Sequence, residues 1–194
     1  MNNEVPIPKR LQQRPRHRGL PIPYIAFIAQ NGEPDFRVID QDKRMMVATH
    51  RMCQLCGHPL GRFMFFVGGP GAAEMNQYFE PPLHLDCLIY AMQVCPFIVG
   101  RIDKHAGVDK VQKKHPDAVV TADETFLDVR QPEWVIKKAL DFQFGMTTQD
   151  TILFLPRQIL GTTAYLYPDK MGPEDWAKVK QELAQSNSPA ATNI

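Results

Sequence analysis

Two pairs of candidate metal ligands constrain the fold of this chain more than any other feature of its sequence. The run Cys53-Gln-Leu-Cys56-Gly57 has the form of a zinc knuckle, a tight turn that directs two thiolates to one point. Glycine after the second cysteine accepts backbone angles that a side chain would resist. His84 and Cys87 are three residues apart at the expected start of a helix, where this spacing places both side chains on one face. The four residues therefore predict one metal site.

Three thiolates and one imidazole form a ligand set typical of structural zinc. They fill a tetrahedral shell and leave no open position for water, so the ion would stabilise the fold and would not hydrolyse a substrate. We therefore expect Cys53, Cys56, His84 and Cys87 to hold structural zinc as the cofactor of this chain. A disulfide framework is a weaker interpretation, because a chain of 194 residues contains only four cysteines.

Other uses of these cysteines and histidines each have a defect. A c-type haem site requires histidine directly after the second cysteine, where Gly57 stands, and a thioredoxin-like dithiol requires a βαβ setting that is not visible here. Cys95 would lie about 12 Å further along the helix than Cys87, too far to bind the same ion. We interpret Cys95 as a buried apolar thiol, and His50 and His58 as polar neighbours of the knuckle.

The elements expected around the ligands follow the order of a treble clef, which is a knuckle, a hairpin and a helix whose first turn donates ligands. We expect the hairpin strands at residues 62–67 and 76–79, around the glycine-rich turn 68–71. The helix is expected at residues 83–94, because prolines suit its first turn and Pro96 interrupts its end.

Further elements are expected on both sides of this core. They are strands at 24–29 and 36–39 around an Asn31-Gly32 turn, a helix capped by Asp40 and ending near residue 50, an extended segment at 118–129, a helix at 132–142, strands at 151–155 and 163–167, and a helix at 173–184. The predicted fold class is therefore α+β, a treble-clef-like, zinc-stabilised core with short hairpins and a C-terminal α/β extension.

Changes in composition divide the chain into five segments. They are a basic flexible arm at 1–19, a zinc-binding treble-clef-like domain at 20–100, a polar connector at 101–117, the C-terminal extension at 118–184 and a disordered tail at 185–194. The longest early apolar run, residues 24–29, is too short for a signal segment or a membrane span. We therefore expect the protein in a reducing cytoplasm.

The N-terminal arm is the clearest indication of an electrostatic partner. It carries a single acidic residue, Glu4, against five basic ones, which are Lys9, Arg10, Arg14, Arg16 and Arg18. The net charge of the whole chain is only +1, so bulk charge supports binding neither to nucleic acid nor to a membrane. A protein partner is the favoured expectation, and nucleic acid bound through the arm is the second.

Enzymatic activity finds little support in the motifs of this chain. The H-x-E signature of zinc deaminases, the phosphate-binding loop and the histidine pattern of finger-based nucleases are all missing from the sequence. The last third contains one acidic cluster without a histidine or lysine at a telling spacing, formed by Asp117, Asp123, Glu124 and Asp128. A diverged treble-clef nuclease, or another enzyme with its site in that third, stays open as an alternative.

Four runs resemble a poorly characterised family of bacterial and bacteriophage proteins over residues 20–100. They are Cys53-Gln-Leu-Cys-Gly-His-Pro-Leu-Gly61, Phe66-Val-Gly-Gly-Pro70, Pro81-Pro-Leu-His-Leu-Asp-Cys87 and Cys95-Pro-Phe97. The resemblance implies a metal site at positions 53, 56, 84 and 87 and a phage or mobile-element origin, but it implies no activity. The doubled Gly68-Gly69 departs slightly from the family pattern and leaves the geometry of that turn open.

Together these features predict a zinc-stabilised, non-enzymatic interaction module that binds a protein through its arm and finger surface. It would work in the bacterial cytoplasm, or in that of the host if a phage encodes it. A structural subunit of a phage assembly is a further alternative.

Overall fold

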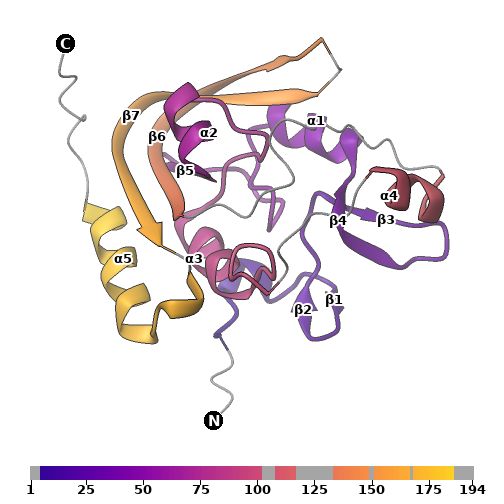
Figure 1. Cartoon of the computed structure of the whole chain (residues 1–194), viewed down its shortest axis with the longest axis horizontal. Coiled ribbons are helices and arrows are strands. Elements are labelled where there is room, and N and C mark those ends of the chain that lie inside the picture. The colour runs from indigo at the N-terminus through magenta and orange to yellow at the C-terminus, as the bar shows by residue number, and fades with distance from the viewer. Residues whose placement is uncertain (1–4, 102–107, 117–132, 149–150, 167, 186–194) are drawn as a thin grey trace.

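The computed structural model describes residues 5–101, 108–116, 133–148, 151–166 and 168–185, and it is built around a three-stranded antiparallel sheet (Figure 1). Its elements, in chain order, are η1 (Lys9–Leu11), β1 (Arg16–His17), β2 (Leu20–Pro21), β3 (Ala26–Ile28), β4 (Pro34–Ile39), α1 (Gln41–Thr49), β5 (Met64–Gly68), α2 (Pro70–Met75), α3 (Leu85–Val94), α4 (Val108–Lys114), β6 (Glu133–Met146), β7 (Ile152–Leu166), η2 (Pro168–Lys170) and α5 (Pro173–Gln185). This mixture of helices with antiparallel strands confirms the α+β class.

The main sheet joins parts of the chain that are far apart in sequence. Its strand order is β5-β6-β7, with Met64 of β5 opposite Ala139 of β6, and β6 pairs with β7 over nearly its whole length. The segments that we divided at residues 100 and 118 therefore share one sheet. Figure 1 shows α5 beside the end of β7 and α2 against β5 and β6.

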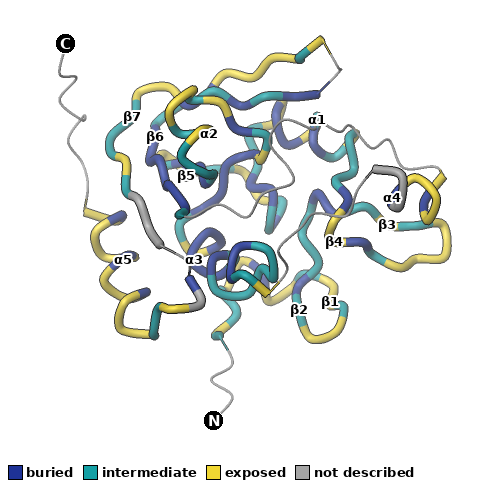
Figure 2. Tube along the Cα trace, in the orientation of Figure 1, coloured by how far each residue is buried: buried dark blue, intermediate teal, exposed yellow. Residues whose placement is uncertain are grey.

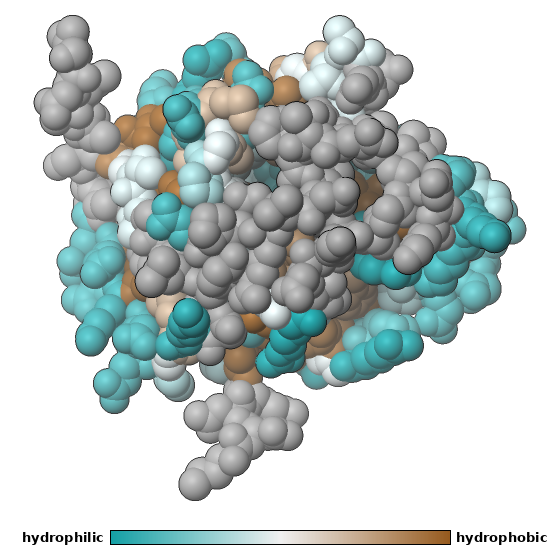
Figure 3. Space-filling model, viewed as in Figure 1, coloured by the Kyte–Doolittle hydropathy of each residue, from teal (hydrophilic) through white to brown (hydrophobic). Residues whose placement is uncertain are grey.

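Strand β5 is buried because its alternate side chains belong to two different hydrophobic clusters. Phe65 and Val67 pack with residues of α3, α5 and the first half of β6, whereas Met64 and Phe66 pack with the far end of the β6–β7 hairpin. Figure 2 shows the buried residues concentrated along β5, β6 and α3. The hydrophilic residues gather instead over α5 and over the β3–β4 hairpin in the space-filling view (Figure 3).

The expected helix at residues 132–142 is wrong, because this part of the chain forms strand β6. Residues 134–140 of this strand are buried or half-buried between β5 and β7 whichever face they lie on, and periodicity alone does not separate such a run from a buried helix. Strand β6 also carries two buried lysines, whose side chains point to opposite faces of the sheet. Each one donates hydrogen bonds to carbonyl groups near the C-terminus of a helix. The ammonium of Lys137 donates to Ala73 O at 2.5 Å near the end of α2, and that of Lys138 donates to Leu183 O at 2.9 Å near the end of α5. Cations suit helix C-termini, where carbonyl groups lack partners.

The expected strands at 151–155 and 163–167 belong to one long strand, β7. The register between β6 and β7 shifts at Lys138 and Ala139, and Gln158 has a left-handed φ of 51° close to that point. Such an irregularity bends a strand without ending it, so the pattern of residues predicts two strands where the chain makes one.

The expected hairpin within residues 62–79 is also different. Only its first strand forms, as β5, and the glycine-rich turn is followed directly by helix α2, with Pro70 at its first position. Residues 76–79 form no strand, and Tyr78 makes an isolated backbone bridge with Phe154. The pairing partner of β5 is β6, which lies more than sixty residues later in the chain.

Several other expected elements are confirmed. The upstream hairpin forms as β3 and β4, and the carboxylate of Asp40 accepts the backbone N–H of Lys43 as the N-cap of α1. Helices α3 and α5 form close to their expected bounds, and the polar connector contains helix α4. The extended segment expected at 118–129 and most of the expected tail lie outside the described residues.

The N-terminal segment is anchored to the core, which corrects the flexible arm expected from its composition. Leu11 is fully buried in the larger hydrophobic cluster, and Val5 and Ile7 pack against the same cluster. The guanidinium of Arg14 donates to Ile22 O at 3.0 Å and lies over the ring of Tyr24. The apolar residues between the basic ones therefore decide the conformation of this segment.

Helix α4 is tied to the β3–β4 hairpin through one buried carboxylate. Asp35 accepts hydrogen bonds from Arg37 at 2.5 and 2.8 Å, from Lys114 at 3.1 Å and from His115 at 3.1 Å. The hydrogen bond from Arg37 is the main cause that holds the pKa of Asp35 far below its usual range; burial opposes this effect, and Lys114 and His115 add to it.

We predict that Leu11→Ala lowers the free energy of unfolding by about 2 to 5 kcal/mol, as expected for truncation of a buried leucine. Urea unfolding followed by circular dichroism measures this loss. Lys9→Ala is the control, because Lys9 is exposed in the same short helix and its truncation should change stability little. Equal stability of the native chain and Leu11→Ala would mean that the segment does not pack on the core.

We predict that Asp35→Asn destabilises the protein by about 1 to 3 kcal/mol at neutral pH, since it removes the charge from several hydrogen bonds. A carboxyl with a depressed pKa stabilises the fold above its unfolded pKa of about 3.9, and this contribution is lost as the pH falls through the folded pKa. The difference between native and variant should therefore shrink below about pH 4. A difference that does not depend on pH would contradict the role of the charge.

Candidate metal centre

The structure brings the four predicted ligands together in one buried cluster. The ligand atoms of Cys53, Cys56, His84 and Cys87 all lie within 4.8 Å of one another. Each of the four residues is less than 9% exposed, and none of the three thiols is in a disulfide. Three sulfurs and one ring nitrogen that converge in this way form a donor set suited to a tetrahedral metal ion.

The first two ligands are positioned by the turn that the sequence predicts. The N–H of Cys53 donates to His58 O at 2.9 Å, and the N–H of Gly57 donates to Cys53 O at 2.8 Å, which closes the knuckle. Gly57 has a φ of +75°, a left-handed angle that favours glycine. A β-carbon at this position would also lie 2.5 Å from the ring of Tyr24, so the knuckle requires glycine for two reasons.

Backbone contacts from two sides hold the knuckle in place. Tyr24 N–H donates to Leu55 O at 3.0 Å, and Ile25 N–H donates to Gln54 O at 3.2 Å. On the other side, the amide of Gln54 donates to Pro81 O at 2.5 Å, just before the helix that carries the second ligand pair. The knuckle is thus connected both to the N-terminal part of the chain and to the start of α3.

The second pair of ligands lies at the start of α3. His84 is the N-cap residue of this helix and Cys87 lies in its first turn, so the helical spacing turns both side chains toward the knuckle. Leu83, directly before the helix, exchanges two backbone hydrogen bonds with Phe65 of β5, at 2.9 and 3.0 Å. The entrance of the helix is therefore fixed relative to the main sheet.

A backbone carbonyl orients the imidazole of His84. Its Nε2 lies 3.0 Å from Pro59 O, and its Nδ1 lies 3.4 Å from the sulfur of Cys56. Because a carbonyl oxygen only accepts, Nε2 carries a proton and donates it, and Nδ1, which faces the thiols, is the atom that would bind a metal ion. This arrangement is typical of a metal-binding histidine.

The electrostatics of the cluster also favour a bound cation. Hydrogen bonds from Cys53 and Cys87 lower the pKa of the Cys56 thiol, and the neighbouring thiols Cys53 and Cys56 raise that of Cys87. Burial lowers the pKa of His84, but the hydrogen bonds and charges of Cys53 and Cys56 outweigh it and raise the value to about 10. The groups therefore share protons among themselves, and a divalent ion would replace those protons and relieve the repulsion between buried thiolates.

The side chains of the other candidate residues are not part of this cluster. Cys95 is the C-cap of α3 and is half-buried against the larger hydrophobic cluster. His50 and His58 are both exposed. The acidic cluster at 117, 123, 124 and 128 falls outside the described residues.

Sequence reasoning missed the residues that support the ligands. Tyr24 packs on Gly57, and Pro59 and Pro81 act through their backbone carbonyls. A backbone carbonyl is present at every position, so the residue type carries no signal for this role. The sequence predicts that position 57 requires glycine, but it does not predict that the ring of Tyr24 packs on this glycine.

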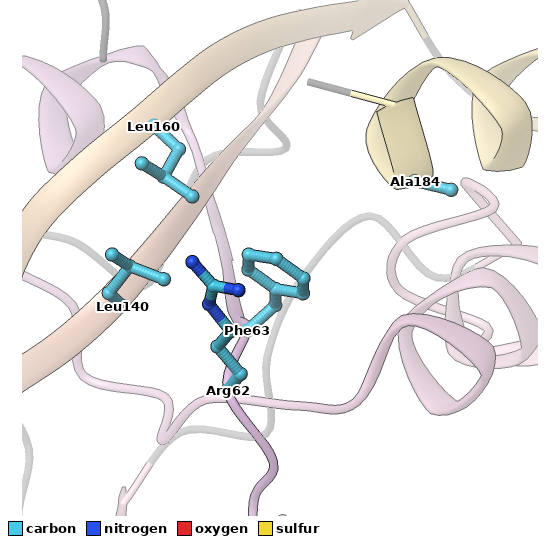
Figure 4. A pocket seen from close by; sticks show the side chains of 5 residues that line it. All are labelled: Arg62, Phe63, Leu140, Leu160 and Ala184. Carbon is cyan, nitrogen blue, oxygen red and sulfur yellow. The ribbon is translucent and has the colours of Figure 1, made fainter. Parts of the chain in front are cut away.

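An open cleft beside the end of α5 is lined by none of the four candidate ligands. It has a volume of about 560 Å³ and is lined by Arg62, Phe63, Leu140, Leu160 and Ala184 (Figure 4). The guanidinium of Arg62 points into it between the apolar side chains. These lining residues include no acid, histidine or nucleophile.

The chain matches no family model, and comparisons with curated proteins and with solved structures found no similar protein. Among the described residues, no helix is both long and apolar enough to cross a membrane. The interpretation of the site therefore depends on its own geometry and chemistry.

We predict that the purified full-length chain contains one metal ion, and that Cys53→Ser or Cys87→Ser loses it and becomes protease-sensitive, because metal binding contributes folding free energy. Elemental analysis and limited proteolysis measure the two effects. Cys95→Ala is the matched control, which should retain the ion because Cys95 lies outside the cluster. A native chain without metal would contradict the site, and loss of metal in the control would show that Cys95 is a ligand.

Proposed function

We propose that this protein is a zinc-stabilised, non-enzymatic interaction module that binds a protein partner. The observation that carries this proposal is the closed and buried donor set of three thiols and one imidazole. Four protein ligands complete a tetrahedral zinc shell and leave no position for substrate or water. The ion would then replace part of a hydrophobic core, and the function would belong to the surface.

We further propose that the metal-binding part is a treble clef. Three features support this. The knuckle at Cys53 and Cys56 comes first, the backbone pairing of Phe65 with Leu83 follows, and helix α3 then brings His84 and Cys87 with its first turn. The long connection between Phe65 and Leu83 contains helix α2, where a plain hairpin would have a turn.

The surface proposed for the partner is a group of four basic side chains on the N-terminal segment. These residues, which we call the basic face, are exposed and are Lys9, Arg10, Arg16 and Arg18. Arg14, the fifth basic residue of this segment, is half-buried and holds the segment together through Ile22. Because the segment is anchored to the core, the basic face is presented in a defined arrangement that suits an acidic surface.

We propose a protein partner in preference to nucleic acid, because the rest of the chain is not basic. The net charge of +1 means that acidic residues elsewhere offset the basic face, and duplex nucleic acid would meet them at longer range. A protein surface of limited size would contact the basic face alone.

We predict that the combined variant Lys9→Ala, Arg10→Ala, Arg16→Ala and Arg18→Ala folds and keeps its metal but loses its partner in affinity capture from the native host. The matched control removes the same charge from four exposed residues elsewhere, by Arg101→Ala, Lys113→Ala, Lys170→Ala and Lys178→Ala. This control should capture the same partner as the native chain. Elemental analysis of all three proteins also tests whether the ion is zinc.

The same proteins distinguish the alternatives. If the partner is a nucleic acid, the native chain should bind DNA or RNA with an affinity that falls steeply with salt, and the basic-face variant should lose most of that slope. Identical capture and identical salt dependence in all three proteins would show that the basic face is not the binding surface.

A further inference from the structure

Strand β7 is the last strand of the main sheet, so one of its edges faces away from β6 (Figure 1). In an antiparallel sheet the backbone groups of successive residues point alternately toward the two edges. The hydrogen bonds of neighbouring elements therefore determine which residues of β7 present their N–H and C=O outward.

The first half of this outer edge is covered by the chain itself. Phe154 exchanges both of its outward hydrogen bonds with Tyr78, at 2.9 and 2.8 Å. Two residues earlier, Ile152 O accepts from Arg44 at 2.6 Å. Two residues later, Pro156 has no N–H, and its carbonyl accepts from Asn76 at 3.0 Å.

In the second half of β7, the pairing of β5 determines which residues point their backbone N–H and C=O groups away from β6. Phe65 bonds with Leu83 and so faces away from β6, which means that Phe66 faces β6 opposite Lys137. Lys138 then faces β7, opposite Gly161. It follows from the alternation that Thr162, Ala164 and Leu166 present their backbone groups outward.

The second half of the outer edge of β7, from Ile159 to Leu166, is not paired with another described strand, and we call it the open edge. Among the described residues, no hydrogen bond reaches the outward backbone groups of Thr162. The run from Ile159 to Leu166 also contains no charged residue and no proline, the features that protect natural edge strands from pairing with another chain. This part of the edge can therefore accept another strand.

We propose that the open edge of β7 pairs with the same edge of a second copy of this chain, antiparallel across a two-fold axis. Such an arrangement is self-complementary, because each outward N–H of one copy meets an outward C=O of the other. The run carries no charge, so two copies bring no like charges together. The dimer would join two main sheets into one continuous six-stranded sheet, from the order β5-β6-β7 in each copy. This inference goes beyond the proposed function and does not rest on it.

Sedimentation equilibrium of the full-length, metal-loaded chain over a wide concentration range tests the proposal. The expected result is a reversible dimer at high concentration. Hydrogen exchange on the same samples should show that the amides of Thr162 and Ala164 become protected as the dimer forms. A chain that stays monomeric at every concentration would overturn the proposal, and so would exchange of these amides that does not change with concentration.

Substitution at Thr162 locates the interface. Thr162→Pro removes one outward N–H without removing a hydrogen bond to β6, and Thr162→Ala keeps that N–H and loses only an exposed side chain. The proline variant should be monomeric and the alanine variant dimeric, with the same metal content and circular dichroism. If the proline variant does not fold, Thr162→Lys provides the same test, since a charge on the edge disfavours pairing. A dimer that persists in the folded edge variant would place the interface elsewhere and overturn the proposal.

Discussion

Three thiols and one imidazole meet in the interior of this protein, and this convergence requires two distant segments to be held in a fixed relation. The knuckle is held by Tyr24 and Ile25 on one side and by the backbone of Pro81 on the other. The helix that carries His84 and Cys87 begins where Leu83 pairs with β5. A bound ion would lock these contacts together, since a metal-binding site of this kind is not formed in an unfolded chain.

The rest of the core depends on β5, which connects the metal centre to the sheet. Its two faces belong to two hydrophobic clusters, so one short strand contributes to both. Strand β6 then adds two buried lysines, whose pKa values are lowered by burial. Each ammonium finds carbonyl acceptors at the end of a helix, α2 for Lys137 and α5 for Lys138, and this pairing offsets the cost of burial.

The proposed function rests on the closed donor set and on two features of the surface. Every ligand position is filled by a protein side chain in the proposed zinc site, and the lining of the cleft beside α5 has no acid–base pair. The described surface also carries the basic face, on a segment that Leu11 anchors to the core, and the outer edge of β7. We propose that both contact other protein chains, one through charge and the other through backbone hydrogen bonds.

The sequence by itself determined the four residues that meet in the metal centre, the α+β class, the N-cap at Asp40 and helices α3 and α5. These follow from local chemistry, because ligand spacing, caps and amphipathic periodicity act within a few residues. Only the tertiary structure decided that residues 133–146 form a strand, that β5 pairs with β6, and that Leu11 anchors the N-terminal segment. In each of these cases a partner from a distant part of the chain buries the segment. An apolar run buried on all sides carries no period that separates strand from helix.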